Sequence, residues 1–244
     1  MAVHYRTKAI IFKKQDLSDF DRVFGIFAFD FGRLDLHAKA IRKINSKLKS
    51  GIDIFYLSEV EFIRGRSKRM LTDAGVLEKN NNIIQDVQKL KIAFQISEIL
   101  DKFIKGQQQD KEIWEFLIDV FGKLNNPQLS INNKQLILCY FIWNFFAVLG
   151  YKPEISKCAV CQGKLNPYNI YFSNKEGGVI CKKCLYADKE AEKINSDVVK
   201  ILRLILKKDW QVVSKLKIEP ASQNLFDIMS NNYYNHILSI FSFK

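Results

Sequence analysis

The first third of the chain alternates apolar and polar residues with a period of two. Residues 33–38 are the clearest case, because Leu34, Leu36 and Ala38 fall on one face and polar residues on the other. This alternation is typical of a half-buried β-strand. We predict strands at residues 5–12, 22–29, 33–38, 52–63 and 68–72, with a tight turn at residues 30–32. Short strands in this number are typical of a small closed barrel, and the OB-fold is one such barrel.

From residue 80 onward the apolar residues recur at helical spacing instead. Three asparagines at residues 80–82 predict the start of a first helix, and Gly106 predicts its end. The buried stripe of this helix is predicted to be Ile83, Val87, Leu90 and Phe94. A second amphipathic helix is predicted from the stripe Ile113, Phe116, Leu117, Val120, Phe121 and Leu124.

Residues 136–149 are apolar almost throughout, which predicts a helix in the middle of a bundle. Later helices are predicted at residues 198–206, with Ser196 as the N-cap, and between residues 224 and 241. The apolar run is too short for a membrane span, which needs about 20 residues. No secretory signal opens the chain. We therefore expect a cytoplasmic protein without a membrane partner.

Four of the five cysteines form two matched pairs. Cys158 and Cys161 make one CxxC motif, and Cys181 and Cys184 make a second one nineteen residues later. Two such pairs at this spacing are typical of a zinc site in which four thiolates complete a tetrahedron. We predict one structural Zn²⁺, which leaves no open position for a catalytic water; free thiols and a redox dithiol are weaker alternatives. Cys139 lies in the apolar run and is expected to be a core residue.

These patterns together predict an α+β protein of two domains. Residues 1–79 are expected to form an N-terminal OB-fold domain, and residues 80–244 a mostly α-helical domain. The four-cysteine zinc module is expected as an insertion in the helical domain, at about residues 152–190.

The net charge of the chain indicates which class of molecule it binds. A net charge of +12 points to a polyanion such as DNA, RNA or an acidic membrane surface, although a merely basic soluble protein stays open. Between residues 33 and 69 there are ten basic and four acidic residues. OB-folds bind single strands with a basic groove and stacking aromatics, and Phe31, Phe55, Tyr56 and Phe62 are candidates for stacking or for core burial. The candidate DNA-binding residues are Arg33, Lys39, Arg42, Lys43, Lys47, Lys49, Arg64, Arg66, Lys68 and Arg69.

The sequence lacks three motifs that are typical of enzymes. The chain has no HExxH, no GxxxxGK[ST] phosphate loop and no GxSxG nucleophile elbow. Asp16, Asp19 and Asp21 form an acidic cluster that a metal-dependent nuclease would use, but Asp and Ser also favour a turn between two strands. We expect a protein that is not an enzyme and keep the nuclease as an alternative.

Several stretches together resemble the RecO family of recombination mediators. The most specific is LGYKPEISKCAVCQGKL at residues 149–165, in which a helix ends in Leu-Gly-Tyr and is followed by Pro and then CxxC. GGVICKKC at residues 177–184 is similar to the second cysteine knuckle of the family. Residues 7–51 and 58–78 resemble its N-terminal OB-fold, so that the resemblance covers essentially the whole chain.

The resemblance implies a function that composition alone does not give. The family binds single- and double-stranded DNA, anneals complementary strands and, with RecR, helps to load RecA onto strands coated with single-stranded-DNA-binding protein. Its helical domain docks the acidic C-terminal tail of that binding protein. Its zinc ligands correspond here to Cys158, Cys161, Cys181 and Cys184. The implied place of action is the cytoplasm, at the nucleoid. The alternative is a zinc-ribbon nucleic-acid-binding module of transcription or translation.

Overall fold

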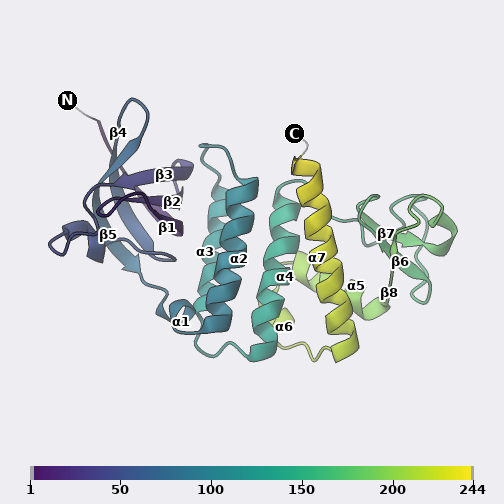
Figure 1. Cartoon of the computed structure of the whole chain (residues 1–244). Helices are drawn as coiled ribbons and strands as arrows, with labels where there is room; N and C mark the ends of the chain where they lie inside the picture. Colours follow the sequence, from purple (N-terminus) through teal and green to yellow (C-terminus); the bar gives the residue numbers. More distant parts are fainter. Residues whose placement is uncertain (1–2, 243–244) are drawn as a thin grey trace. The chain divides into compact units, whose positions relative to one another are not determined.

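The structure is a computed structural model of the whole chain, and it describes residues 3–242, without the side chains of residues 131 and 132 (Figure 1). The chain divides into two compact units, Met1–Lys134 and Gln135–Lys244. Each unit has its own packing and is described separately.

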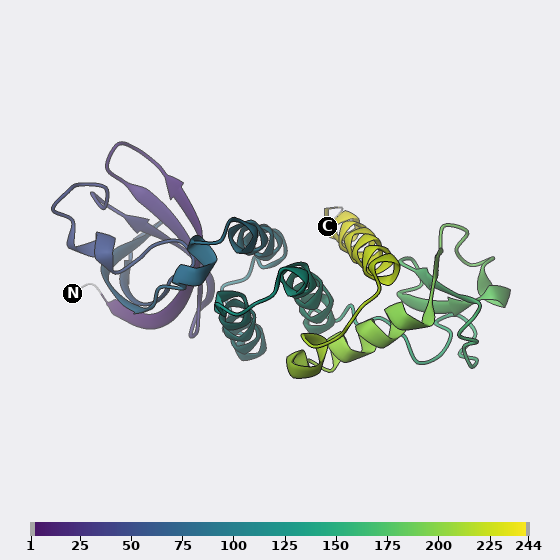
Figure 2. The same cartoon turned by 90° about the horizontal axis from the view of Figure 1, so that it is seen from below.

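The first unit begins with five strands that pair into a closed ring (Figure 2). Around the ring the order is β1-β2-β3-β5-β4, and β4 pairs with β1 to complete it. Neighbouring strands are antiparallel except β3 and β5, which are parallel. The strands are β1 (His4–Asp16), β2 (Arg22–Ala28), β3 (Gly32–Ala38), β4 (Leu57–Arg64) and β5 (Arg69–Glu78).

One strand prediction was wrong at its start. β4 begins at Leu57, so residues 52–56 of the predicted strand are not part of the sheet. The run is apolar for a different reason: Ile52 packs into the interior of the ring, and Phe55 adopts φ +63° and is fully buried. A run of apolar residues indicates burial, but only regular pairing makes it a strand.

The interior of the ring is filled by every second residue of the strands, as the alternation predicts. Leu34, Leu36 and Ala38 of β3 point inward, which confirms the face predicted for them. The remaining members of this core are Ala9, Ile11, Phe24, Ile26, Ala28, Ile41, Ile52, Val60, Phe62 and Leu71.

Helices α2 (Val87–Phe103) and α3 (Lys111–Asn125) complete the first unit, with the short α1 (Asn81–Ile84) before them. Phe55 links the ring to both long helices, because its ring centroid lies 5.1 Å from that of Phe94 and 5.9 Å from that of Phe121. Phe29 makes a further edge contact with Trp114, at 5.6 Å between centroids. The aromatic contacts hold the helices against the ring.

The predicted first helix is interrupted, and its predicted stripe was wrong in part: Ile83 is buried as predicted, but Val87 and Phe94 are exposed. The chain turns at Gln85, and Asp86 begins α2 by accepting hydrogen bonds from the backbone N–H groups of Gln88 and Lys89. Val87 is 82% exposed and Phe94 46% exposed. The buried face of α2 consists of Lys89, Ile92, Ala93, Ile96, Ser97, Ile99, Leu100 and Phe103. In α3 the predicted stripe is confirmed, since all six residues are buried.

The second unit is built around α4 (Ile131–Val148), whose apolar residues are buried nearly all round as predicted. Trp143 stacks on Tyr233 of α7 (Pro220–Ser242) at 4.2 Å and donates a hydrogen bond to Ser230 at 2.9 Å. The Asn144 amide donates to the carbonyl of Ile205 at 3.0 Å, which explains a polar residue in this apolar helix. None of the helices in residues 3–242 has the length and apolarity that a membrane crossing needs.

Two short helices and a small sheet complete the second unit. α5 (Ser196–Leu206) is capped by Asn195, whose side chain accepts from the N–H groups of Asp197 and Val198, so the predicted cap at Ser196 was one residue late. α6 (Trp210–Val213) follows it. The sheet has the order β7-β6-β8 and consists of β6 (Ile170–Ser173), β7 (Gly178–Cys181) and β8 (Glu192–Ile194).

An ion-pair network ties the ring to α2. Asp101 of α2 accepts from the Arg33 guanidinium at 2.7 Å and from the Lys13 ammonium at 2.7 Å. Burial alone would raise the pKa of the Asp101 carboxyl, but the hydrogen bonds from Lys13 and Arg33 outweigh burial and lower this pKa below its ordinary value.

We expect Asp101→Asn to lower the free energy of unfolding by roughly 1–3 kcal/mol, because it leaves the poorly exposed Arg33 without its main charge partner. Glu98→Gln is the matched control, since it removes the same charge from the exposed face of α2. It should change the stability by no more than about 0.5 kcal/mol. Chemical denaturation of the three proteins measures the difference.

The same variant should show a defined pH dependence. The folded pKa of Asp101 lies below the ordinary value of 3.8, so its carboxylate stabilises the fold fully above that value. This stabilisation disappears as the pH falls through the lower folded pKa. The stability gap between the wild type and Asp101→Asn should therefore be full at neutral pH and narrow below about pH 4. A gap of constant size across this range would contradict the assignment.

Candidate metal centre and nucleic-acid interface

The four paired cysteines come together in the second unit. The sulfur atoms of Cys158, Cys161, Cys181 and Cys184 all lie within 4.8 Å of one another. Among the described residues this is the group of three or more His, Cys, Asp or Glu side chains that has the geometry to hold a metal ion. Cys158 and Cys184 are buried, whereas Cys161 is exposed.

Local backbone structure brings the two motifs to one point. The first knuckle is a tight turn in which the Cys158 N–H donates to Gly163 at 2.9 Å and the Gln162 N–H donates back to Cys158 at 2.9 Å. The second knuckle follows β7, which ends at Cys181, and a 3-10 turn, η2 (Lys182–Cys184), carries Cys184 inward. The Cys181 N–H lies 3.4 Å from the Cys158 sulfur, so the backbone of one knuckle faces a sulfur of the other.

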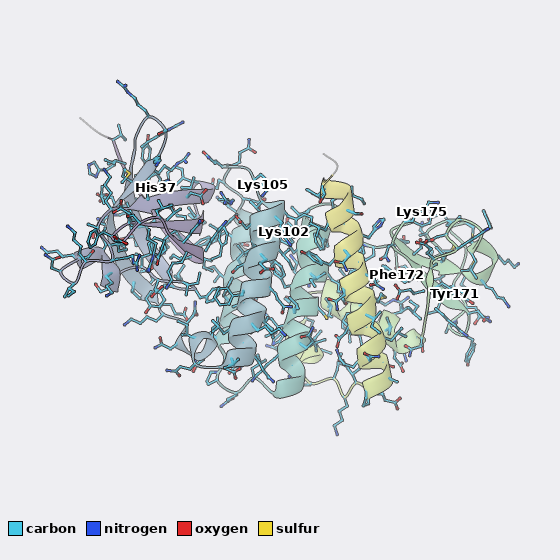
Figure 3. All side chains as sticks on the ribbon, viewed as in Figure 1. His37, Lys102, Lys105, Tyr171, Phe172 and Lys175 are labelled. Atoms are coloured by element: carbon cyan, nitrogen blue, oxygen red, sulfur yellow. The ribbon has the colours of Figure 1, made fainter. Side chains whose placement is uncertain are left out.

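Gly178 allows the first knuckle to dock on β7. A Cβ atom at this position would lie 2.3 Å from the Glu154 carbonyl oxygen, so only glycine permits the approach. The Val179 N–H then donates to Glu154 at 2.7 Å, and the Ala159 N–H donates to Val179 at 2.8 Å. The sheet itself is visible beside the labelled Tyr171, Phe172 and Lys175 (Figure 3).

The electrostatics of the cluster favour a cation. Burial opposes ionisation of Cys158, but hydrogen bonds from the backbone N–H groups of Cys161 and Cys181 outweigh it and lower the pKa of the Cys158 thiol to about 6. Burial and the neighbouring sulfurs raise the pKa of Cys184 to about 12. Neighbouring thiolates repel one another, and a divalent cation removes that repulsion. A closed set of four sulfur donors suits Zn²⁺ best.

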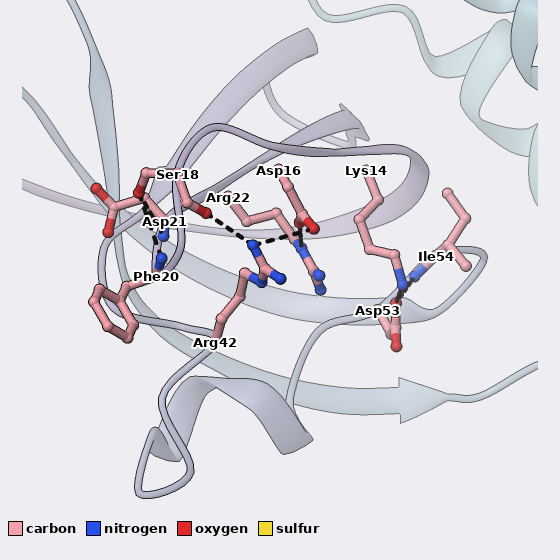
Figure 4. A network of polar contacts seen from close by, with 9 residues as sticks. All are labelled: Lys14, Asp16, Ser18, Phe20, Asp21, Arg22, Arg42, Asp53 and Ile54. Carbon is pink, nitrogen blue, oxygen red and sulfur yellow. Dashed lines mark hydrogen bonds and ion pairs between the residues drawn. The ribbon is translucent and has the colours of Figure 1, made fainter.

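The first basic cluster lies on the segment between β3 and β4, where Lys39, Arg42, Lys43, Lys47 and Lys49 are all exposed. The β1–β2 loop packs against the start of this segment (Figure 4). The Arg42 guanidinium donates to the Ser18 carbonyl at 2.8 Å, and the Lys43 ammonium lies 5.2 Å from the centre of the Phe20 ring. The loop thus supports the backbone of the cluster and adds an exposed aromatic residue, Phe20, that the sequence reasoning missed.

The second basic cluster lies on the turn between β4 and β5, where Arg64, Arg66 and Lys68 are exposed and Arg69 is half-buried. The parallel pairing of β5 with β3 sets this turn beside the outward face of β3. His37 of β3 lies there (Figure 3), and burial together with the positive charge of Lys68 lowers its pKa. Both clusters are therefore anchored to the same strand.

Within the described residues, two of the ten candidates form ion pairs, Arg33 and Arg42, and Arg33 is the less exposed of them. Its side chain is 18% exposed, and it forms ion pairs with Asp101 and Asp35. Two of the three acidic residues of the nuclease alternative, Asp16 and Asp21, are engaged by neighbouring groups. Asp16 pairs with Arg22 at 2.6 Å (Figure 4), which lowers the pKa of its carboxyl. Asp21 accepts a hydrogen bond from the Ala40 N–H at 2.8 Å.

The candidate aromatic residues divide by exposure. Phe55 and Phe62 are buried, whereas Phe31 and Tyr56 are half-buried. Tyr5 was not among the candidates, yet its ring contacts both Phe31 and Phe62. The period of two along β1 was the available signal, because it places Tyr5 on the inward face at the end of the ring.

Comparison with known proteins identifies the family. Family models described as Recombination protein O N terminal and Recombination protein O C terminal match residues 1–79 and 84–243. The chain belongs to the RecO family. This confirms the resemblance seen in the sequence.

Curated RecO proteins align along most of their length. A DNA repair protein RecO from Dehalococcoides mccartyi is 30% identical over 214 residues, which is 88% of this chain and 83% of the relative. The RecO of a Roseiflexus species is 26% identical over 96% of this chain and 81% of its own length. The RecO of Desulforamulus reducens is 22% identical over 96% of this chain and 90% of its own length. The chain is a RecO-family DNA repair protein.

Metal content tests the cysteine cluster directly. We expect one zinc ion per chain in the wild type and a clear reduction of zinc in Cys158→Ser and Cys181→Ser, because three thiolates leave the tetrahedral set incomplete. Cys139→Ala is the matched control, since Cys139 is a buried cysteine outside the cluster. Elemental analysis of the purified proteins gives the stoichiometry. A metal-free wild type, or equal zinc in all variants, would contradict the site.

Proposed function

We propose that this RecO-family protein binds single- and double-stranded DNA, anneals complementary strands and, with RecR, helps to load RecA onto DNA coated with single-stranded-DNA-binding protein. The observation that carries the proposal is the unpaired positive charge on the loops of the strand ring. Within the described residues, no carboxylate lies within ion-pair distance of Lys39, Lys47, Lys49, Arg64, Arg66 or Lys68.

The strand order supports an OB-fold as the DNA-binding domain. The ring is closed by a parallel pair between β3 and β5 and by an antiparallel pair between β1 and β4. We propose residues 1–79 as this domain and residues 80–244 as the helical domain, with the zinc module inserted in the latter at about residues 152–190. The helices α1 to α3 lie in the same compact unit as the ring. In OB-folds the strands and their loops form the surface for single strands.

The proposed mechanism of annealing is electrostatic. Two DNA strands repel each other through their phosphates, and a surface of exposed Lys and Arg side chains neutralises both strands and lowers this repulsion. Contacts to phosphates carry no sequence information, so any complementary pair can be brought together. No covalent bond is formed or broken, and hence neither a nucleotide cofactor nor a catalytic residue is needed.

The zinc ion would serve the structure of the second unit. Cys158, Cys161, Cys181 and Cys184 would hold it, and four thiolates leave no position for a water or substrate. Its chemistry would be the cross-linking of the two knuckles. The exposed side chains of Lys157, Lys164, Lys182 and Lys183 would offset the negative charge of the thiolates.

A pocket in the second unit supports docking of the acidic tail of the single-stranded-DNA-binding protein. It measures about 300 Å³ and contains the aliphatic side chains of Ile201, Leu204, Leu216 and Ile218. Lys200, Lys217, Asp197 and Glu219 also line it; Lys200 pairs with Asp197 at 2.9 Å, and within the described residues Lys217 has no ion pair. Apolar side chains for an aromatic terminus and ammonium groups for its carboxylates are the chemistry that such a peptide requires.

The second candidate function, a zinc-ribbon module that binds RNA, is favoured by the cysteine cluster alone. The two functions differ in their preferred nucleic acid. Competition between DNA and RNA strands of one sequence for the protein separates them: the mediator should be displaced from DNA by DNA at least as readily as by RNA. Preferential displacement by RNA would put the zinc-ribbon function first.

Charge reversal tests the DNA-binding surface. We expect Lys47→Glu with Arg66→Glu to weaken binding to a single strand and to reduce the slope of log affinity against log salt by about 0.7 for each phosphate that is no longer bound. Lys91→Glu with Lys111→Glu is the matched control, because it makes the same change at exposed positions of α2 and α3. Fluorescence anisotropy over a salt series measures both quantities. Equal slopes in the two double variants would count against the loops.

A further inference from the structure

A small aromatic pocket lies at one end of the strand ring. It has a volume of about 140 Å³ and combines residues of β1, β3, β4 and β5 with the β2–β3 turn and the loop between α2 and α3. Its lining residues are Tyr5, Phe31, Leu34, Phe62, Arg64, Arg69 and Gln107.

Three rings form a compact group in this pocket. Tyr5 stacks on Phe62 with 5.4 Å between centroids and an interplanar angle of 22°. Phe31 stands edge-on to both, at 5.7 Å from Tyr5 and 5.5 Å from Phe62. Phe62 is buried, whereas Tyr5 and Phe31 keep part of their surface exposed. The pocket therefore presents aromatic surface to a ligand.

Two arginines, Arg64 and Arg69, line this pocket, so it is not simply apolar packing at the end of the ring. The other arginines of the strands and of the β3–β4 segment each have a carboxylate within ion-pair distance: Arg6, Arg22, Arg33 and Arg42. Within the described residues Arg64 and Arg69 have none, and Arg69 donates instead to the neutral amide of Gln107. Two guanidinium groups beside aromatic rings, with no anion to match them, are suited to a ligand that is both planar and negatively charged.

The wall formed by the α2–α3 loop is held in place. Gly32 in the β2–β3 turn has φ +65°, and a Cβ atom there would lie 2.2 Å from the Gln108 carbonyl oxygen. This close contact fixes the loop against the turn, one residue away from Gln107. The pocket is thus a preformed feature of the first unit.

We propose that this pocket receives one unpaired base of a DNA strand, which stacks on Tyr5 and Phe31 while Arg64 and Arg69 hold an adjacent phosphate. The proposal rests on the DNA binding proposed above and specifies the ligand of one part of that surface. The pocket has a volume of about 140 Å³, and we propose that it receives a single base and not a base pair. A base that has paired must leave it, so the annealed product keeps only the contacts to its backbone.

An abasic strand separates base binding from backbone binding. The probes are a thymidine oligonucleotide and an abasic oligonucleotide of the same length, which carry the same phosphates. The wild type should bind the thymidine strand more tightly. Because stacking of one base on an aromatic side chain is worth roughly 5- to 150-fold in affinity, Phe31→Leu should lower the affinity for the thymidine strand by a factor in this range. Its affinity for the abasic strand should not change.

Two conservative controls accompany this variant. Phe31→Tyr keeps the aromatic ring and should retain the preference for the thymidine strand. Arg66→Gln removes a charge from the same turn but does not line the pocket, so Arg64→Gln should weaken binding of the thymidine strand more than Arg66→Gln does. Equal affinity of the wild type for the two strands would overturn the pocket and leave the DNA-binding function intact. Absence of binding to either strand would overturn both.

Photochemical cross-linking gives a readout that needs no variant. A strand carrying 5-iododeoxyuridine should cross-link to Tyr5 or Phe31 in the wild-type protein, as mapped by mass spectrometry of the peptides. Cross-links confined to residues outside the pocket would contradict the proposal.

Discussion

The parallel pairing of β5 with β3 is the constraint on which the proposed nucleic-acid surface depends. It joins Leu36 to Arg69 and His37 to Met70, and with the pairing of β1 and β4 it closes the strand ring. Through it the β4–β5 turn lies beside β3, while the C-terminal end of β3 leads directly into the first basic cluster. Both clusters thereby take their position from one strand. The pocket that holds Arg64 and Arg69 exists only in the closed ring.

In the first unit, some basic side chains form ion pairs within the fold, whereas others have no carboxylate partner within the described residues. Arg33 and Lys13 are used internally, because Asp101 holds both of them and links the ring to α2. Arg22 and Arg42 share Asp16 in the same way. The other bases of the two connecting loops have no carboxylate partner within the described residues, and so a polyanion could replace the water and counterions around them. Stability and ligand binding are thus assigned to different side chains of one basic domain.

The sequence predicted the structure best where a pattern depends only on residues that are close in the sequence. The alternation of β3, the stripe of α3 and the two CxxC motifs each correspond to the structure, because strand pleat, helical period and knuckle geometry are local properties. Reasoning from the sequence failed where tertiary contacts decide. The buried face of α2 is set by the ring and α3, so Val87 and Phe94 are exposed despite their spacing. Phe55 lies outside the strands: its backbone N–H donates to Ile11 of β1, and its ring packs on Phe94 and Phe121 of the helices.

Ion pairs between residues that are far apart in the sequence could not be predicted either. Arg33 and Asp101 are 68 residues apart, and no local pattern connects them. For the same reason the sequence offered only Phe31 and Phe62 of the aromatic pocket as candidates and missed Tyr5, since the three residues come from separate segments. The four cysteines were the exception, because their chemistry requires that they meet.

The most direct test of the mediator function is the annealing of two complementary DNA strands coated with single-stranded-DNA-binding protein, followed over time with and without this protein. We expect the protein to accelerate annealing at low salt and this acceleration to fade as the salt concentration rises, because the contacts to phosphates are electrostatic. An unchanged annealing rate at every salt concentration, with folded and zinc-loaded protein, would contradict the account.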